Sequence, residues 1–431
     1  MRLKRLTLKH FRNIASQALT LSPRLNILLG QNGQGKTNIL EAVYTLSNAR
    51  SNRTGQDREL IQHGELMAGI EAEVTPHAYE GYTVLAMQWR CQPQPGDETA
   101  TRLQTTCLLN DKRLKSRSEL LGYLPSVSFF LSDLQLLRGA PDDRRRWLDT
   151  AVTQWDHQHL KRVSAYQRIR QQKSQLLKQP PHLIDATTLG LWNEQLAQAG
   201  AALTAARLRY LAAISPCATM RHQELTGVAN PAAEEAMALV IHYQANHLAL
   251  PEIPTGIEQE ELAAQLQPVL LAAMTAREAD ERRRATCLVG PHRDDLRFWM
   301  GEDQIDVETY GSQGQQRTVV LAVKLAEWAL LQHSLGEPPL LLLDDVMAEL
   351  DPLRQRYLVE HIDPHGQVIL TTTHLDDALK TMLMSWMAAG YQSGETDHPV
   401  AIFQVSRGQV QTENTMPPAT ERQEAPVAAP G

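Results

Sequence analysis

Apolar residues in the first third of the chain mostly repeat with a period of two, which is typical of β-strands. The predicted strands are residues 3–11, 25–29, 70–74, 82–89, 106–109 and 127–131. The polar stretch 92–99 predicts a loop, and Asn110-Asp111 predicts a turn. Residues 38–46 instead carry apolar side chains at helical spacing, directly after a glycine-rich stretch. The pattern therefore predicts a sheet-rich N-terminal region that contains one helix.

From Pro141 onward, the apolar spacing changes to three and four residues, which is typical of amphipathic helices. The predicted helices are residues 141–178 with interruptions, residues 189–214, and residues 258–284 with a kink or split at Pro268. Pro180-Pro181 ends the first of these, and residues 237–243 fit a strand. No heptad pattern persists over many turns, so a long coiled-coil arm is excluded.

The strand pattern returns after residue 285, and we expect this region to complete the N-terminal α/β unit. The predicted division is an N-terminal head at 1–140, an inserted and mainly helical lobe at 141–284, a C-terminal part of the head at 285–411, and a tail at 412–431. The tail is rich in Pro, Glu, Ala and Thr, which predicts disorder. We therefore expect an α/β head that is interrupted by a helical lobe.

Composition excludes several classes of protein. The 431 residues are 42% hydrophobic and contain no apolar run of 18 residues, so no membrane span is expected. Charges interrupt the first nine residues, which lack the apolar core of a signal sequence, and we expect a cytoplasmic protein. No two of the four cysteines lie within metal-ligand spacing, which excludes a zinc site or a Cys-x-x-Cys hook.

Residues 30–37 read Gly30-Gln31-Asn32-Gly33-Gln34-Gly35-Lys36-Thr37, a complete G-x-x-x-x-G-K-T phosphate loop. The loop lies between a predicted strand and a predicted helix, the context that gives this motif its function. Backbone N–H groups at the helix start bind phosphate oxygens, and Lys36 reaches the β- and γ-phosphates. The Thr37 hydroxyl is a ligand for Mg²⁺. The motif therefore predicts an ATP site.

A second apolar strand ends in paired acids, Leu343-Asp344-Asp345. Asp344 at the strand end is predicted to hold Mg²⁺, and Asp345 to orient or polarise an attacking water. The plain structural alternative is that an acid at this position caps a helix. His374 follows another strand, at residues 368–373, where it is placed to contact the γ-phosphate, although a lone histidine is more often structural.

Ser312-Gln313-Gly314-Gln315 begins a predicted helix that continues beyond Leu325. A hydroxyl and glycine N–H groups at a helix start form an anion site. Because the phosphate loop already binds one nucleotide, this second site is expected to serve the γ-phosphate of a facing subunit. The alternative is a simple capped helix.

These motifs, in this order, resemble those of the ATP-binding-cassette superfamily in its chromosome-maintenance branch. The particular residues within the motifs resemble those of the RecF family of bacterial recombination mediators. The matching stretches are Phe11-Arg12-Asn13, residues 35–42, residues 290–296, residues 312–317 and residues 342–351. The resemblance implies that ATP joins two heads, each nucleotide lying between one phosphate loop and the partner's signature. It extends the ATP contacts to Arg12, Asn13 and Asn38, and it identifies Asp351 with the D-loop.

The same resemblance implies a clamp on gapped DNA or on junctions between single and double strands. The implied partners are RecR, RecO and RecA, in DNA repair, replication and the SOS response. Net charge is −7, yet residues 1–60 and 138–178 are locally basic, with ten Lys or Arg in each against three and four acids. These basic runs favour DNA contact, and solvated helix faces are the alternative. On charge alone, the DNA candidates are Arg50, Arg53, Arg144, Arg145 and Lys161.

Two features depart from the wider superfamily or stay open. Asp345 stands where most cassette ATPases have Glu, and its shorter side chain predicts slow hydrolysis, that of a weak DNA-stimulated ATPase. The residue of the usual Gln-loop is either Asp133 or Gln135.

Three other classes of ATPase share parts of this motif set. A transporter subunit normally has a Leu-Ser-Gly-Gly-Gln signature and no insertion like 141–284. A cohesion or hook protein needs several hundred residues of heptads or a zinc hook. A fused nuclease needs a further acidic module, for which the C-terminal region is too short.

Overall fold

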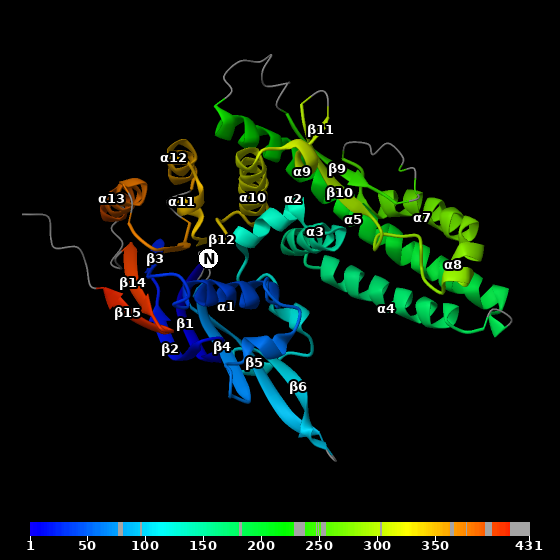
Figure 1. The fold of residues 1–431 in the computed structure, drawn as a ribbon, viewed down its shortest axis with the longest axis horizontal. Helices are drawn as coiled ribbons and strands as arrows, with labels where there is room; N and C mark the ends of the chain where they lie inside the picture. The colour runs from blue at the N-terminus through cyan, green and yellow to red at the C-terminus, as the bar shows by residue number, and fades with distance from the viewer. Residues whose placement is uncertain are drawn as a thin grey trace, which may run out of the picture.

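The computed structural model places an α/β head beside a lobe of long helices (Figure 1). It describes residues 1–75, 81–94, 97–180, 183–227, 238–246, 248, 250, 256–301, 304–362, 366–375, 377–392 and 399–413. In Figure 1 the two six-stranded sheets and helix α1, Lys36–Asn48, lie at the lower left. The helices α4, His159–Leu177, α5, Ala186–Thr226, and α7, Gln259–Ala276, extend to the right. Among the described residues, no helix is long and apolar enough to cross a membrane.

A six-stranded sheet forms the centre of the head, in the order β15-β14-β3-β13-β12-β8. Its strands are β3 Leu25–Leu29, β8 Ser126–Phe129, β12 Leu340–Asp344, β13 Val368–Thr372, β14 Val400–Ser406 and β15 Gln409–Glu413. The neighbours are parallel, except for the β14–β15 pair. Alternate residues enter opposite cores: Leu341 and Leu343 face the helical side, and Leu340 and Leu342 face α1. The inner strands β3, β12 and β13 are largely apolar because both faces of the sheet are covered there.

A second, antiparallel sheet packs across helix α1, Lys36–Asn48, which lies between the two sheets. Its strands, in the order β2-β1-β4-β5-β6-β7, are β1 Arg2–Phe11, β2 Ile14–Thr20, β4 Met67–Thr75, β5 Thr83–Gln94, β6 Asp97–Leu109 and β7 Lys112–Arg113. The loop predicted at 92–99 is wrong for its described residues, which extend the β5–β6 ladder. Backbone hydrogen bonds between β5 and β6 form these strands even though the side chains are polar, so polar composition alone wrongly predicted a loop. The turn at Asn110-Asp111 is confirmed, since both residues have positive φ.

The lobe consists of long helices around the 41-residue α5. Its elements are α3 Pro141–Trp155, α4 His159–Leu177, α5 Ala186–Thr226, α7 Gln259–Ala276, α8 Glu278–Arg284, and the strands β9 Leu239–Gln244, β10 Asp295–Met300 and β11 Ile305–Asp306. At 1.5 Å per residue, α5 is roughly 60 Å long. It packs on α4, α7 and α10 and therefore joins the lobe to the head.

The remaining elements connect these layers. They are α2 Gln135–Arg138, α9 Val307–Tyr310, α10 Gln313–Leu335, α11 Val346–Glu349, α12 Pro352–His361, α13 Asp377–Gln392, and the 3-10 helices η1 Asp57–Leu60, η2 Arg117–Leu120 and η3 Leu131–Leu134. Helix α10 runs from the signature motif into the helical core, and 13 of its residues are buried. Its start and its body therefore link the candidate signature to the rest of the head.

Two boundaries differ from the sequence prediction. The third helix continues through Pro268 and breaks at Arg277. Pro268 is exposed, so water can satisfy the backbone carbonyl that its missing N–H leaves without a partner. The strand after residue 285, β10, pairs with β9 and extends the lobe's own sheet instead of the head sheet.

The predicted tail begins with residues 412 and 413, which belong to β15. Residues 414–431 lie outside the described part of the chain. The division into head, lobe and tail stays a prediction.

Candidate functional site

The phosphate loop connects β3 to α1 as the motif predicts. Gly33 and Gly35 have φ of 78° and 114°, in the left-handed region that favours glycine. At Gly30, an added Cβ would lie 2.3 Å from the carbonyl oxygen of Val405 on β14. Glycine at these positions lets the backbone turn sharply and lie against the sheet, and α1 begins directly after the loop.

The Lys36 side chain folds back over this loop. Its ammonium donates to the carbonyl oxygens of Gly30 and Gln31, at 2.5 and 3.0 Å. Burial lowers the pKa of Lys36, and the carboxylates of Asp345 and Asp344 oppose that shift. A cation is therefore held at the N-terminus of a helix, where the helix dipole also favours an anion.

Asp344 connects the two halves of the site. Its Oδ1 accepts hydrogen bonds from the hydroxyls of Thr37, at 2.9 Å, and Thr371, at 2.8 Å. Thr371 is the register partner of Asp344 on the parallel neighbour β13, which explains why the two meet. Burial raises the pKa of Asp344.

The oxygens of Thr37 and Asp344 are the hard ligands that Mg²⁺ prefers. The described residues contain no cluster of three or more His, Cys, Asp or Glu that could hold a metal. Mg²⁺ would therefore share its coordination with phosphate oxygens and water, as is usual for this ion. The donor set fits the predicted ion on these terms.

Asp345 has the left-handed φ of 54°, which is unusual outside glycine. Its N–H donates to Thr371 Oγ1 at 2.9 Å, while its Oδ1 is buried without a hydrogen-bond partner. It occupies the N-cap position of α11, but its side chain makes no capping hydrogen bond. The structural alternative, that Asp345 caps the helix, is therefore not supported. Its Oδ1 is available to accept a hydrogen bond from a water molecule.

A cavity of about 580 Å³ surrounds these groups. Its lining includes Asn32, Gly33, Gly35, Lys36, Thr37, Asn38, Asp344 and Asp345, together with Asn13, Asn52, Arg53, Ser132 and Thr371. Asn13 accepts a hydrogen bond from Asn38 at 2.8 Å and donates to the carbonyl of Gln34 at 3.3 Å. The sequence analysis did not identify Asn52, Ser132 and Thr371 as residues that line the cavity. For Thr371 alone the sequence held a signal, because Thr371 lies near the end of a predicted strand that pairs with the strand of Asp344.

Arg12 and Arg53 meet at Glu41, a carboxylate that is fully buried on α1. Arg12 donates to Glu41 at 2.7 and 3.1 Å, Arg53 at 3.2 Å, and the Ser51 hydroxyl at 2.6 Å. Arg12 was predicted to bind ATP but does not line the cavity. Arg53 was predicted to bind DNA, and the structure instead places it in the nucleotide cavity.

The signature forms a capping box at the start of α10. Ser312 Oγ accepts from the Gln315 N–H at 3.2 Å, and the Gln315 side chain accepts from the Ser312 N–H at 2.8 Å. Ser312, Gln313 and Gly314 are exposed, and none of residues 312–315 lines the cavity. Within one chain the motif acts as a helix cap, and its Ser312 hydroxyl proton is not used in that bond.

The other predicted residues do not line this cavity. His374 is exposed after β13, and Asp351 caps α12 by accepting from the N–H groups of Leu353 and Arg354, at 3.1 and 3.0 Å. Of the two Gln-loop candidates, Asp133 accepts from the Phe130 N–H at 2.7 Å, and Gln135 lines a neighbouring cavity. Burial raises the pKa of Asp133. The neighbouring Ser132, rather than either candidate, lines the nucleotide cavity.

The remaining DNA candidates differ in exposure. Arg144 is buried and paired with Asp295 at 2.7 Å, which removes it from the candidates because no DNA phosphate can reach it. Arg145 is half-buried and paired with Asp142, and Arg50 binds Thr150. Lys161 is exposed.

Comparison with known proteins places these features in context. The family model "RecF/RecN/SMC N terminal domain" matches residues 2–388. The DNA replication and repair protein RecF of Rippkaea orientalis is 38% identical over 93% of this chain and 100% of its own length. RecF of Symbiobacterium thermophilum is also 38% identical, over 90% and 95% of the two chains. A solved structure of a recombination mediator protein RecF with ATP, from a RecFOR pathway, has a TM-score of 0.78 at 25% identity and covers 95% of this chain and 97% of its own.

Proposed function

Because this chain belongs to the RecF family of DNA replication and repair proteins, we propose that it is an ATP-dependent DNA clamp of recombinational repair. ATP binding agrees with the phosphate loop and with the ATP-bound relative. The proposal concerns what ATP does: it joins two copies of the chain into a dimer that holds DNA. The observation that carries it is that the exposed signature lies outside the cavity of its own chain.

A second chain would complete each site by presenting Ser312, Gln313, Gly314 and Gln315 to the nucleotide. The exposed start of α10 supplies N–H groups and a hydroxyl proton, which suit the charge of a γ-phosphate. Exposed apolar side chains lie close to these motifs in the sequence or line the cavity: Leu131 is 60% exposed, Tyr310 is 75% exposed and Leu353 is 61% exposed.

We propose the following role for each side chain in ATP hydrolysis. Lys36 and the loop N–H groups would bind the phosphates, while Thr37 and Asp344 would hold Mg²⁺. When bound there, the ion would supply positive charge that neutralises the phosphate oxygens. Asp345 orients and polarises the attacking water, and His374 contacts the γ-phosphate. Because Asp345 is shorter than Glu, we propose slow hydrolysis, so that ATP acts mainly as a conformational switch.

We further propose that the dimer clamps gapped DNA or junctions of single and double strands. It would act with RecR and RecO to promote RecA loading, in DNA replication, repair and the SOS response. The similarity to a recombination mediator of a RecFOR pathway supports this role.

Asp345→Asn is expected to lower ATP hydrolysis by about 100-fold or more, because it weakens the base that positions the water. ATP binding should persist, since Lys36 and the loop remain. Single-turnover hydrolysis and equilibrium ATP binding, measured side by side, test this. Asp345→Glu is the matched control and should hydrolyse ATP at least as fast as the unchanged protein. Normal hydrolysis by the Asn variant would reject Asp345 as the catalytic carboxylate.

DNA binding should depend on nucleotide and on salt. With ATP, the chain should bind gapped DNA more tightly than blunt duplex, and with ADP or no nucleotide this affinity should fall. Phosphate contacts release counterions, so log affinity should fall linearly with log salt concentration. Fluorescence anisotropy on gapped, single-stranded and blunt substrates measures all three effects. Equal affinity with ATP and ADP, or no response to salt, would contradict the clamp.

A further inference from the structure

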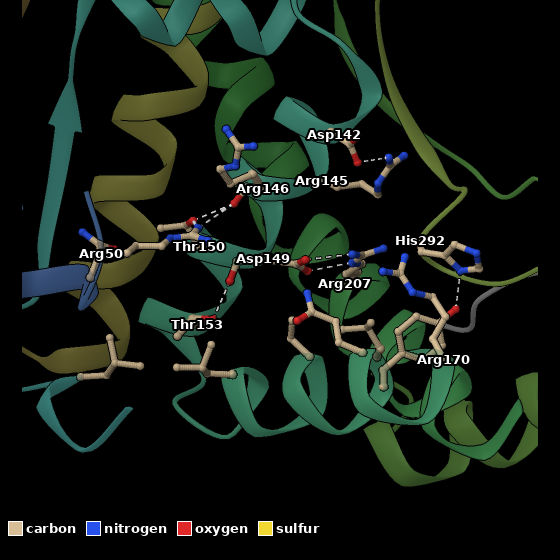
Figure 2. Close-up of a pocket in the computed structure, with 17 residues that line it drawn as sticks. Arg50, Asp142, Arg145, Arg146, Asp149, Thr150, Thr153, Arg170, Arg207 and His292 are labelled. Carbon is tan, nitrogen blue, oxygen red and sulfur yellow. Dashed lines mark hydrogen bonds and ion pairs between the residues drawn. The ribbon is translucent and has the colours of Figure 1, made fainter. Parts of the chain in front are cut away.

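A second cavity, of about 350 Å³, lies where the chain after α1 meets the lobe helices α3, α4 and α5 (Figure 2). Arginines from four segments line it: Arg50, Arg145, Arg146, Arg170 and Arg207. The carboxylates in its lining are Asp142 and Asp149. Burial lowers the pKa of His292, also in the lining, to about 3, so this histidine is neutral at pH 7. Positive charge therefore exceeds negative charge around the cavity.

One of these arginines has a structural role. Arg207 is buried and binds both oxygens of Asp149, each at 2.9 Å, and it also donates to the Pro291 carbonyl at 2.8 Å. Figure 2 shows this pair at the centre of the view. Arg207 and Asp149 neutralise each other, so the excess charge resides on the other four arginines.

Those four arginines are weakly neutralised. The Arg170 guanidinium makes no hydrogen bond or ion pair within the described part of the chain, although Asp142 lies within electrostatic range. Arg50 binds neutral acceptors, the Thr150 hydroxyl and the Arg146 carbonyl. Arg145 pairs with Asp142 and also donates to the Asp294 carbonyl at 2.5 Å, and Arg146 pairs with Asp143. Water competes for both carboxylates, which are 80% and 36% exposed. Such a cleft concentrates anions from solution.

We propose that this cavity binds the phosphates of a DNA strand. The proposal deepens the DNA-binding function argued above and rests on it. Guanidinium groups match phosphate oxygens in geometry and stay charged at every physiological pH. Figure 2 shows Arg50 at one side of the cavity and Arg170 at the other, with Arg145 and Arg146 along its upper edge. This spread suits successive phosphates along a strand better than one isolated phosphate group.

Arg170→Gln tests the site, because it removes a guanidinium that pairs with no described residue. In anisotropy titrations of gapped DNA with ATP, we expect affinity at 0.1 M salt to fall about five- to tenfold. The slope of log affinity against log salt should fall by about 1. The double variant Arg146→Gln/Arg170→Gln should lose about twice that slope. Arg168→Gln is the matched control, because Arg168 is exposed on the same helix and does not line the cavity.

A thermal unfolding midpoint near that of the unchanged protein identifies the variants that are folded. Folded single and double variants with unchanged affinity and slope would overturn the cavity assignment but leave DNA binding by the unchanged protein intact. Failure of the unchanged protein to bind DNA would overturn both proposals.

Chemical modification of arginine distinguishes binding of DNA phosphates from binding of free inorganic phosphate. DNA should protect Arg50, Arg146 and Arg170 from phenylglyoxal, as mapped by mass spectrometry, and should leave Arg168 reactive. Protection by inorganic phosphate but not by DNA would identify a small-anion site and reject the proposal.

Discussion

Lys36→Ala is expected to abolish ATP binding, with a loss of affinity of at least about 100-fold. Among the described residues that line the nucleotide cavity, Lys36 and Arg53 carry positive charge. Arg53 is already paired with Glu41, so Lys36 is the cation placed to bind phosphate. Each charge-assisted hydrogen bond is worth roughly 1.5–3 kcal/mol, and losing about two of them accounts for the expected effect. Equilibrium dialysis or fluorescent nucleotide titration measures it.

Two variants serve as controls for Lys36→Ala. Lys36→Met keeps most of the aliphatic side chain, so a similar loss of ATP binding would assign the effect to the charge. Lys112→Ala removes an exposed lysine of β7, on the antiparallel sheet, and should bind ATP normally. ATP affinity of Lys36→Ala within a few-fold of the unchanged protein would show that nucleotide binds elsewhere.

Ser312→Arg is expected to leave ATP binding by the single chain intact and to remove ATP-driven dimers. Ser312 lies outside the cavity of its own chain, so a change there should not disturb Lys36, Thr37 or Asp344. A bulky side chain at the start of α10 would instead block a partner's γ-phosphate. Sedimentation velocity with and without ATP, together with a nucleotide titration, measures both effects. We expect the dimer dissociation constant to rise by at least about 100-fold, as for other central interface residues.

Loss of the helix cap must be separated from loss of the interface, because N-cap substitutions cost about 1 kcal/mol. Ser312→Asp keeps a good N-cap yet places negative charge against the partner's γ-phosphate, so it should also prevent dimers. Asp185→Ala removes the cap of α5, where Asp185 accepts from the Thr188 N–H, and it should dimerise normally. Dimers of normal stability with either Ser312 variant would rule out the signature acting in trans.

The motifs were predictable because the residues that act together in each motif lie only a few positions apart in the sequence. The phosphate loop follows β3 and precedes α1, and Asp344 ends β12, as the apolar pattern predicts. The capping box of Ser312 and Gln315 likewise follows from residues three apart. Local sequence fixes such features because the interacting groups are neighbours in the chain.

Features that depend on distant pairing were not predictable. Within the basic run 138–178, Arg144 pairs with Asp295 and Lys173 with Glu281, each more than a hundred residues away, so these two cations are already neutralised. Glu41 likewise forms ion pairs with Arg12 and Arg53, which come from two other segments of the chain. Charge counts along a chain do not reveal which cations the fold has already neutralised.

The strand order of the head sheet has a consequence for how the chain folds during synthesis. Strand β3 lies between β13 and β14, and Leu25 is in register with Val368 on one side and Val400 on the other. A ribosome releases β3 long before β13 and β14 are synthesised, so this apolar strand at first has no strand to pair with. The helices α4, α5 and α7 can form in the meantime by local contacts. The phosphate loop is anchored only when β13 and β14 arrive. We therefore expect a nascent chain that still lacks β13 and β14 not to bind nucleotide.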